Sequence, residues 1–291
     1  MFWALIFLSN FIIQPVFAQD ITPSVAPEQI TLTPSVTLAP SETPAPSQIL
    51  TPTQNPVFIL YDQYKNDYLF QYDEYKKAYL NYKDKKEVYT KYGTLTTQQE
   101  KLDATKKAIL ARNKMLKAFL MALRVDLDKY KSINSTETEK LQIELSKWEA
   151  WFEEQNLVAG SFNNDDDVKK WVSEFKSKYV QIQQIIYTSM VQGEVNLRQS
   201  TLNQILSLAQ EIKASPNIDP KGQEWFQSLP VKVDLINSSL KSAQETTKQK
   251  QSANRFTEFY SDSKRYLNKS VSYLLQMESD LKSIVIKFSQ P

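Results

Sequence analysis

The stretch YDQYKNDYLFQYDEYKKAYLNYKDKKEVYTKY, residues 61–92, decides the fold of this chain. It contains nine of the fifteen tyrosines of the sequence, at steps of three, four or seven residues. Such steps return a side chain to the same face of an α-helix. On a helical wheel Tyr61 through Tyr89 fall within an arc of about 100°, and charged residues occupy much of the remaining circumference. The stretch therefore predicts one long helix with a phenolic face.

Helix-breaking residues are rare beyond this stretch as well. After Pro56 no proline occurs until Pro216, and Gly93, Gly160 and Gly193 are the only glycines of that interval. A long segment with so few breakers is typical of helices. Asn55 is a suitable N-cap before Pro56, whose missing N–H costs nothing at the first helical position.

A tight turn is expected after the first helix, which should end near Tyr92. Gly93 suits the left-handed position that follows a helix. The next helix is expected to begin at Thr96 or Thr97, with Gln99 or Glu100 completing a capping box. These signals predict two antiparallel helices.

The second helix carries leucine and isoleucine at heptad spacing, and its middle is apolar around most of its circumference. This pattern favours a central position. The seam consists of Leu102, Ile109, Leu116, Leu120, Leu123, Leu127 and Tyr130. A third helix is expected over residues 136–156, and its acidic side chains complement the basic second helix, so the two should be neighbours.

A fourth helix should follow the sequence NNDDD and run to Lys213, with Leu208 among its buried residues. Pro230 is expected to open a last helix with a heptad seam at Tyr260, Leu267, Leu274, Leu281 and Phe288. The polar middle of that helix, residues 242–254, should project beyond the bundle, kink, or meet a partner. The fold class is therefore all-α, an elongated antiparallel bundle of about five long helices with coiled-coil-like packing.

The N-terminal part of the chain differs in composition from the rest. Residues 1–18 are apolar and end in small residues around Val16 and Ala18, which indicates a secretory signal peptide. Residues 19–55 are rich in Pro, Thr and Ser, so we expect a disordered linker or stalk. In polyproline II geometry its upper reach is about 110 Å. Residues 56–291 form the expected helical bundle domain.

This leader predicts an extracytoplasmic location, either secreted or at the cell surface. If the signal is not cleaved, it would act as an N-terminal membrane tether. No segment after the signal is apolar enough for a spanning helix, so no integral membrane domain is expected once it is cleaved. The formal charge of +2 is too small to indicate a nucleic-acid partner.

The residue inventory points away from catalysis and from metal binding. The chain contains no Cys and no His, which excludes disulfides, thiolate nucleophiles and the commonest metal ligands. Asp165, Asp166 and Asp167 suggest a cation site, but acids at a helix N-terminus more often cap the helix. We expect no enzymatic activity, no catalytic residue, no metal site and no cofactor.

The tyrosine row has two interpretations. Tyrosine offers a large apolar body and a hydroxyl that reaches water at the edge of a narrow bundle, which explains the row by packing alone. The alternative is an aromatic platform for glycans or another protein. Its candidate ligand-binding residues are Tyr68, Tyr72, Tyr75, Tyr79 and Tyr82.

These observations favour a non-enzymatic binding or structural module displayed on a stalk. The expected partner is a protein or a cell-envelope component, and the long helices also suit a homo-oligomer. One alternative is an extracytoplasmic holdase-type chaperone, and another is a cell-wall polysaccharide binder that uses the tyrosines.

Overall fold

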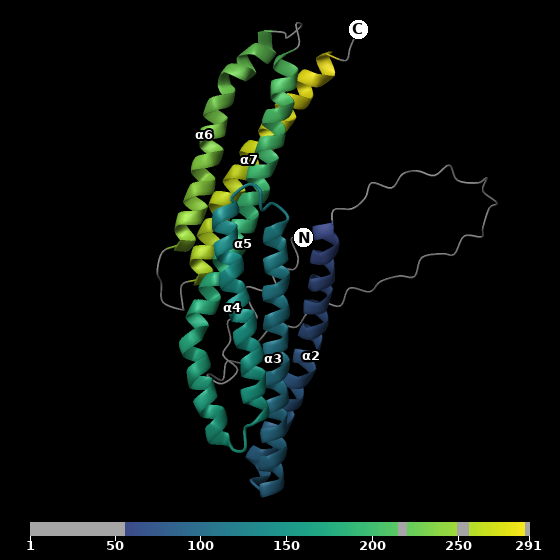
Figure 1. Cartoon of the computed structure of the whole chain (residues 1–291), viewed down its shortest axis with the longest axis vertical. Helices are drawn as coiled ribbons and strands as arrows, with labels where there is room; N and C mark the ends of the chain where they lie inside the picture. The colour runs from purple at the N-terminus through teal and green to yellow at the C-terminus, as the bar shows by residue number, and fades with distance from the viewer. Residues whose placement is uncertain (1–55, 215–219, 249–255, 289–291) are drawn as a thin grey trace, which may run out of the picture. The chain divides into compact units, whose positions relative to one another are not determined.

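The computed structural model describes residues 56–214, 220–248 and 256–288. Every regular element in these ranges is an α-helix (Figure 1), which confirms the all-α prediction. The helices are α2 (Pro56–Tyr92), α3 (Leu95–Asp128), α4 (Ser135–Gly160), α5 (Asp165–Lys213), α6 (Pro220–Lys248) and α7 (Phe256–Phe288). One more helix is present than the sequence predicted.

Glycine and threonine make the turn between α2 and α3. Gly93 has a φ of 59°, the left-handed conformation expected there. The predicted cap was wrong, because Thr94 rather than Thr96 or Thr97 is the N-cap. The Thr94 hydroxyl accepts from the Thr97 N–H at 3.2 Å, and the Thr97 hydroxyl accepts from the Thr94 N–H at 3.1 Å. A threonine hydroxyl thus completes the capping box in place of Gln99 or Glu100.

Helix α3 is central, as its apolar middle predicted, and contacts α2, α4 and α5. Six residues of its predicted seam are buried, namely Leu102, Ile109, Leu116, Leu120, Leu123 and Leu127. Its basic side chains meet acids of α4: Lys117 Nζ lies 2.6 Å from Glu153 Oε2, and Arg124 Nε lies 2.9 Å from Glu149 Oε1. The predicted charge complementarity between these two helices is confirmed.

Helix α5 is 49 residues long, or about 70 Å at 1.5 Å per residue. Asn164 caps its start by accepting from the N–H groups of Asp166 and Asp167. It passes through Gly193 without interruption, and a small residue suits this position because α3 lies close. A Cβ on Gly193 would lie 3.3 Å from Asp126 Oδ2. Leu208 was expected to be buried but is exposed, and Leu202, Ile205 and Ala209 are buried instead.

The C-terminal half of α5 packs against α6 and α7. The prediction of a single last helix that opens at Pro230 was wrong. Helix α6 already begins at Pro220 and contains Pro230, and a separate α7 begins at Phe256. The two helices are antiparallel, since Lys232 Nζ lies 2.6 Å from Asp280 Oδ2 while the Ser263 hydroxyl donates to the Ala243 carbonyl. The heptad seam of α7 is buried at Tyr260, Leu267, Leu274 and Leu281.

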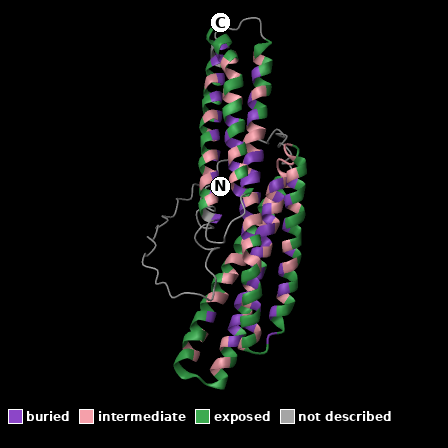
Figure 2. Ribbon diagram, turned by 90° about the vertical axis from the view of Figure 1, so that its left-hand side faces the viewer, coloured by how far each residue is buried: buried purple, intermediate pink, exposed green. Residues whose placement is uncertain are grey.

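A polar layer joins the two groups of helices around the middle of α5. Asn196 Nδ2 donates to the Thr138 hydroxyl of α4 at 3.0 Å, and Gln192 Nε2 donates to Asn196 Oδ1 at 2.7 Å. From α6, Gln244 Nε2 donates to Gln192 Oε1 at 2.8 Å. Figure 2 shows that the buried residues lie along the inward faces of the helices.

The predicted signal peptide, residues 1–18, and the predicted linker, residues 19–55, lie outside the described residues. Asn55, the expected first N-cap, lies outside them too. No helix in the described ranges has an apolar stretch long enough to cross a membrane.

Candidate functional site along the tyrosine helix

The tyrosine face of α2, formed by Tyr61, Tyr64, Tyr68, Tyr72, Tyr75, Tyr79, Tyr82 and Tyr89, lies against α3. Three contacts fix this over the length of the helix. The ring centroid of Tyr68 is 5.3 Å from that of Phe119. Lys129 Nζ is 3.0 Å from the Tyr61 ring centroid, and Lys101 Nζ is 4.2 Å from that of Tyr89. Apolar and cation–π contacts therefore hold α2 on α3.

The five candidate ligand-binding residues form one continuous row at this contact. Ring centroids are 6.2 Å apart for Tyr68 and Tyr72, 6.0 Å for Tyr75 and Tyr79, and 6.2 Å for Tyr79 and Tyr82. Tyr82 is buried, with 7 % of its surface exposed, and the other four are half-buried. The row therefore combines packing with ring edges that a ligand could reach, and ligand binding by these residues stays a prediction.

Burial changes the acidity of the phenols. Desolvation is the main cause that raises the pKa of Tyr61, Tyr68 and Tyr82 to about 12. These side chains are therefore neutral at physiological pH, and their chemistry is that of hydrogen-bonding aromatic surfaces.

Arg112 of α3 is buried beneath the row, a position that no sequence pattern indicated. Its guanidinium carbon is 4.0 Å from the Phe175 ring centroid and 5.0 Å from that of Trp171. Burial lowers its pKa to about 10, an effect that the nearby Tyr75 and Tyr179 oppose. Nε and Nη2 make no hydrogen bond within the described part of the chain. The aromatic faces thus supply the main compensation for this buried cation.

The aromatic rings around Arg112 come from α4 and α5, which the sequence did not show to be close. Trp151 lies 6.0 Å from Phe175 between ring centroids, and Trp171 lies 5.3 Å from Phe175. The Trp171 indole N–H donates to Gln155 Oε1 at 2.7 Å. Trp151 lies ten residues before the connection at residues 161–164, and Phe175 lies eleven residues after it. That spacing is the signal that could have predicted this cluster.

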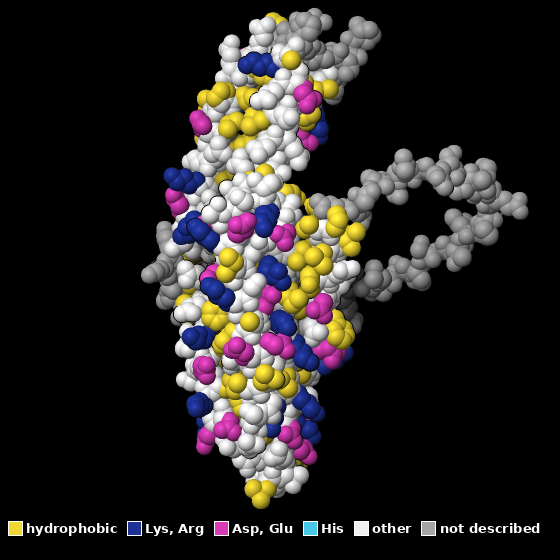
Figure 3. All heavy atoms as spheres, in the orientation of Figure 1, with side chains coloured by type: hydrophobic (Ala, Val, Ile, Leu, Met, Phe, Trp, Pro, Cys, Tyr) yellow, Lys and Arg dark blue, Asp and Glu magenta, His cyan; other side chains and the backbone are white. Residues whose placement is uncertain are grey.

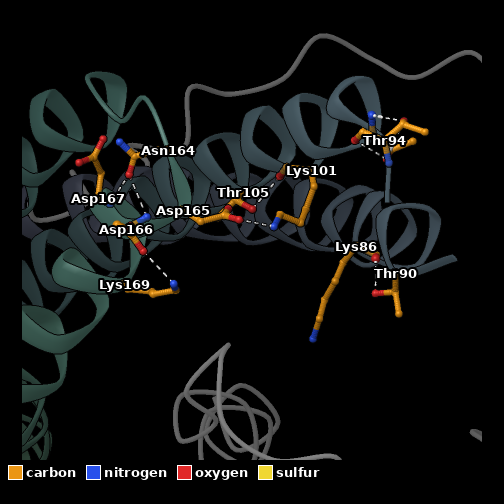
Figure 4. A network of polar contacts seen from close by, with 11 residues as sticks. Lys86, Thr90, Thr94, Lys101, Thr105, Asn164, Asp165, Asp166, Asp167 and Lys169 are labelled. Atoms are coloured by element: carbon orange, nitrogen blue, oxygen red, sulfur yellow. Dashed lines mark hydrogen bonds and ion pairs between the residues drawn. The ribbon is translucent and has the colours of Figure 1, made fainter. Parts of the chain in front are cut away.

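The acidic run at the start of α5 is occupied by protein partners (Figure 4). Asp165 Oδ2 lies 2.6 Å from Lys101 Nζ of α3, and Asp166 Oδ1 lies 2.8 Å from Lys169 Nζ. Asp167 Oδ2 accepts from the Asn163 N–H at 2.8 Å. Among the described residues no group of three or more His, Cys, Asp or Glu could hold a metal ion. The acidic run therefore occupies the first turn of α5, where the helix dipole favours negative charge, and Asp165 ties α5 to α3; the capping side chain itself is Asn164.

The opposite side of α2 is apolar and open. We define the outer face of α2 as Phe58, Ile59, Asp62, Asn66, Leu69, Phe70, Asp73, Lys77 and Leu80, all of which are exposed. Phe70 and Leu80 retain 60 % and 63 % of their surface. Hydrophobic side chains gather over α2 on the right of Figure 3. Since single exposed apolar residues are common but a row of them on one helix is not, this face is a candidate contact surface.

Comparison of the chain with protein-family models, with curated protein sequences and with solved structures gives no match.

Proposed function

We propose that this protein is a non-enzymatic helical binding or structural module, located outside the cytoplasm and displayed on a stalk formed by residues 19–55. The observation that carries the proposal is the outer face of α2. A helix whose one side is buried against α3 and whose other side exposes Phe58, Leu69, Phe70 and Leu80 offers an extended surface for another macromolecule.

The proposed partner is a protein or another component of the cell envelope. The signal-like residues 1–18 support a location outside the cytoplasm. The Pro/Thr/Ser-rich composition of residues 19–55 supports a spacer that would hold the helices away from a surface. On this proposal no residue is catalytic and no cofactor is required.

A capture experiment tests the binding role. Residues 56–291 and a variant with Phe70→Ser and Leu80→Ser would be immobilised and exposed to intact cells or to isolated envelope. We expect the parent chain to retain a partner that the variant loses, because the substituted side chains contribute to the contact surface but not to the core. Equal capture by both chains, or capture by neither, would contradict the role of this face.

The holdase alternative is favoured by a separate observation. Further large apolar side chains are exposed on other helices, including Ile143 and Leu157 on α4, Val231 on α6 and Leu275 on α7. A chaperone that cradles unfolded chains would use such dispersed contacts. Suppression of the heat-induced aggregation of an unrelated enzyme would favour this alternative, and a specific partner with no such suppression would favour the binding module.

The third candidate, a cell-wall polysaccharide binder, depends on the tyrosine row. Its test is binding to isolated wall polymer, with Tyr72→Phe and Tyr79→Phe to remove the two hydroxyls while the rings remain. Binding that is lost in this pair of variants would support hydrogen bonding by the phenols to glycans.

A further inference from the structure

The outer face of α2 repeats every eleven residues. Phe58, Leu69 and Leu80 are separated by eleven, and so are Asp62, Asp73 and Asp84. Eleven residues make three helical turns of about 3.67 residues, so a row with this spacing drifts little around a nearly straight helix. The apolar and acidic side chains therefore stay on one side over the length of α2.

The charge of α2 is divided between its two halves. Residues 56–74 contain four acidic and one basic residue, whereas residues 75–92 contain six basic and two acidic residues. Such a helix is electrostatically complementary to itself when the second copy runs in the opposite direction. A parallel arrangement would place like charges side by side.

The outer face also matches itself at several of its positions. If two antiparallel copies are related by a two-fold axis between Leu69 and Phe70, residue n of one copy lies level with residue 139 − n of the other. Ile59 then lies level with Leu80, Asp62 with Lys77, and Leu69 with Phe70. In this arrangement Ile59, Leu69, Phe70 and Leu80 each lie level with an apolar side chain of the other copy, and each Asp62 lies level with a lysine. Phe58, near the start of the helix, lies level with Asn81.

We propose that the outer face of α2 binds the same face of a second copy of this chain, antiparallel, with the two-fold axis between Leu69 and Phe70. The interface is isologous, so it closes at a dimer and does not extend into a filament. Asp62 makes no ion pair among the described residues. Lys77 pairs with Glu74 of its own helix at 2.8 Å, and because such an exposed pair contributes little to stability, Lys77 can exchange it for Asp62 of the second copy.

This inference rests on the proposed function, because it names the partner of the same surface. An experiment can nevertheless contradict the dimer without contradicting the proposed binding function. A chain that is monomeric alone but still captures an envelope component through Phe70 and Leu80 would overturn the dimer and leave the binding role intact.

Charge reversal tests the pairing. The full chain would be compared by sedimentation equilibrium with Asp62→Lys, with Lys77→Asp and with the double variant. Each single reversal acts twice in a symmetric dimer, so we expect the dissociation constant to rise about tenfold or more. The double variant should return to within about threefold of the parent, because it exchanges the two partners.

Two outcomes of this comparison would overturn the proposal. One is a parent chain that remains monomeric at all concentrations. The other is a dimer that neither single reversal weakens, or that the double variant fails to restore. Asp67→Lys is the matched control, since Asp67 lies on another side of the helix. Because the substituted side chains are exposed, every variant should fold like the parent chain. Circular dichroism melts check this.

Cysteine cross-linking tests the register, since the chain has no cysteine of its own. Leu69→Cys lies beside the axis and should form a disulfide-linked dimer under mild oxidation. Leu80→Cys alone should not, because the two copies of residue 80 would be about 30 Å apart. A mixture of Ile59→Cys and Leu80→Cys chains should cross-link to each other. Self-linkage of Leu80→Cys would indicate a parallel pair or another register and would overturn the proposal.

Discussion

Individual tyrosines of α2 differ in how deeply they are buried, and this difference sets their contribution to stability. Tyr82 is 7 % exposed, whereas Tyr92 at the end of the helix is 60 % exposed. Tyr82→Ala should lower the free energy of unfolding by about 3 to 5 kcal/mol, and Tyr92→Ala by no more than about 0.5 kcal/mol. In thermal melts this corresponds to a drop in Tm of roughly 6 to 20 °C for the first variant. Similar melting of both variants would show that the face is not anchored on α3.

The raised phenol pKa values predict instability at alkaline pH. Tyr61, Tyr68 and Tyr82 have a pKa of about 12 in the folded chain, above the value of about 10 expected when unfolded. Above pH 10 the unfolded chain therefore loses protons that the folded chain retains, so the unfolding free energy falls as pH rises towards 12. Below pH 10 these three groups are protonated in both states and contribute no pH dependence to the unfolding free energy.

Denaturant titrations at pH 9, 10 and 11 measure this dependence. The triple variant with Tyr61→Phe, Tyr68→Phe and Tyr82→Phe should lose less stability over that range than the parent chain, because phenylalanine has no proton to release. Lysines also titrate in this pH range, but they are the same in both chains, so their effect cancels in the comparison. An unchanged slope in the triple variant would contradict burial of these hydroxyls.

Contacts between side chains of different helices are the part of the candidate site that could not be predicted from the sequence. The spacing of the tyrosines predicted one face covered by a neighbouring helix, since periodicity depends only on local geometry. The position of Arg112 beneath Phe175 and Trp171 depends on the register between α3 and α5, which no local pattern encodes. Thr94 was missed for a different and local reason: its partner in the capping box is Thr97, whereas the usual glutamine or glutamate signal favoured Thr96 or Thr97 as the N-cap.

At the scale of elements, the breakers predicted helix ends well where a glycine or an N-cap residue marked them. Gly93 ends α2 as the sequence indicated, whereas α5 begins at Asp165, within the sequence NNDDD rather than after it, with Asn164 as its N-cap. Pro230 failed as a marker because proline is tolerated inside a helix when packing holds both sides, at the cost of one backbone hydrogen bond. Trp225 and Ile236, which flank it in α6, are both buried, and that packing depends on the rest of the fold.

Pro230 therefore offers a test at the level of one helix. Its side chain is exposed and it lies inside α6. Pro230→Ala restores an N–H that can donate to the preceding turn and relieves the steric conflict with it, so we expect unfolding free energy to rise by about 1 to 3 kcal/mol. Chemical denaturation measures the change. A destabilised variant would show that a bend at Pro230 is needed for packing on α7.

At the scale of the whole helical part, α5 serves two groups of helices. Towards its start it packs with α3 and α4 and towards its end with α6 and α7 (Figure 1), and both sets of contacts occur between Tyr187 and Asn196. The layer of Gln192, Asn196 and Thr138 lies where the two groups meet. Hydrogen-bonded amides and hydroxyls specify the register between helices, but they bury less apolar surface than leucine would. The two groups of helices should therefore be coupled more weakly to each other than the helices within either group.

This arrangement predicts that the two groups of helices open separately. Ile236 of α6 and Leu145 of α4 are each fully buried, one on either side of the polar layer. Replacement of either by Ala should cost about 2 to 5 kcal/mol. Amide hydrogen exchange should then accelerate in α6, α7 and the C-terminal half of α5 for Ile236→Ala, but in α3, α4 and the N-terminal half of α5 for Leu145→Ala. The two variants are controls for each other, because each leaves the protection of the opposite group near that of the parent. Equal acceleration in all helices for both variants would instead show that α5 transmits the loss through the polar layer, and that the helices unfold as one cooperative unit.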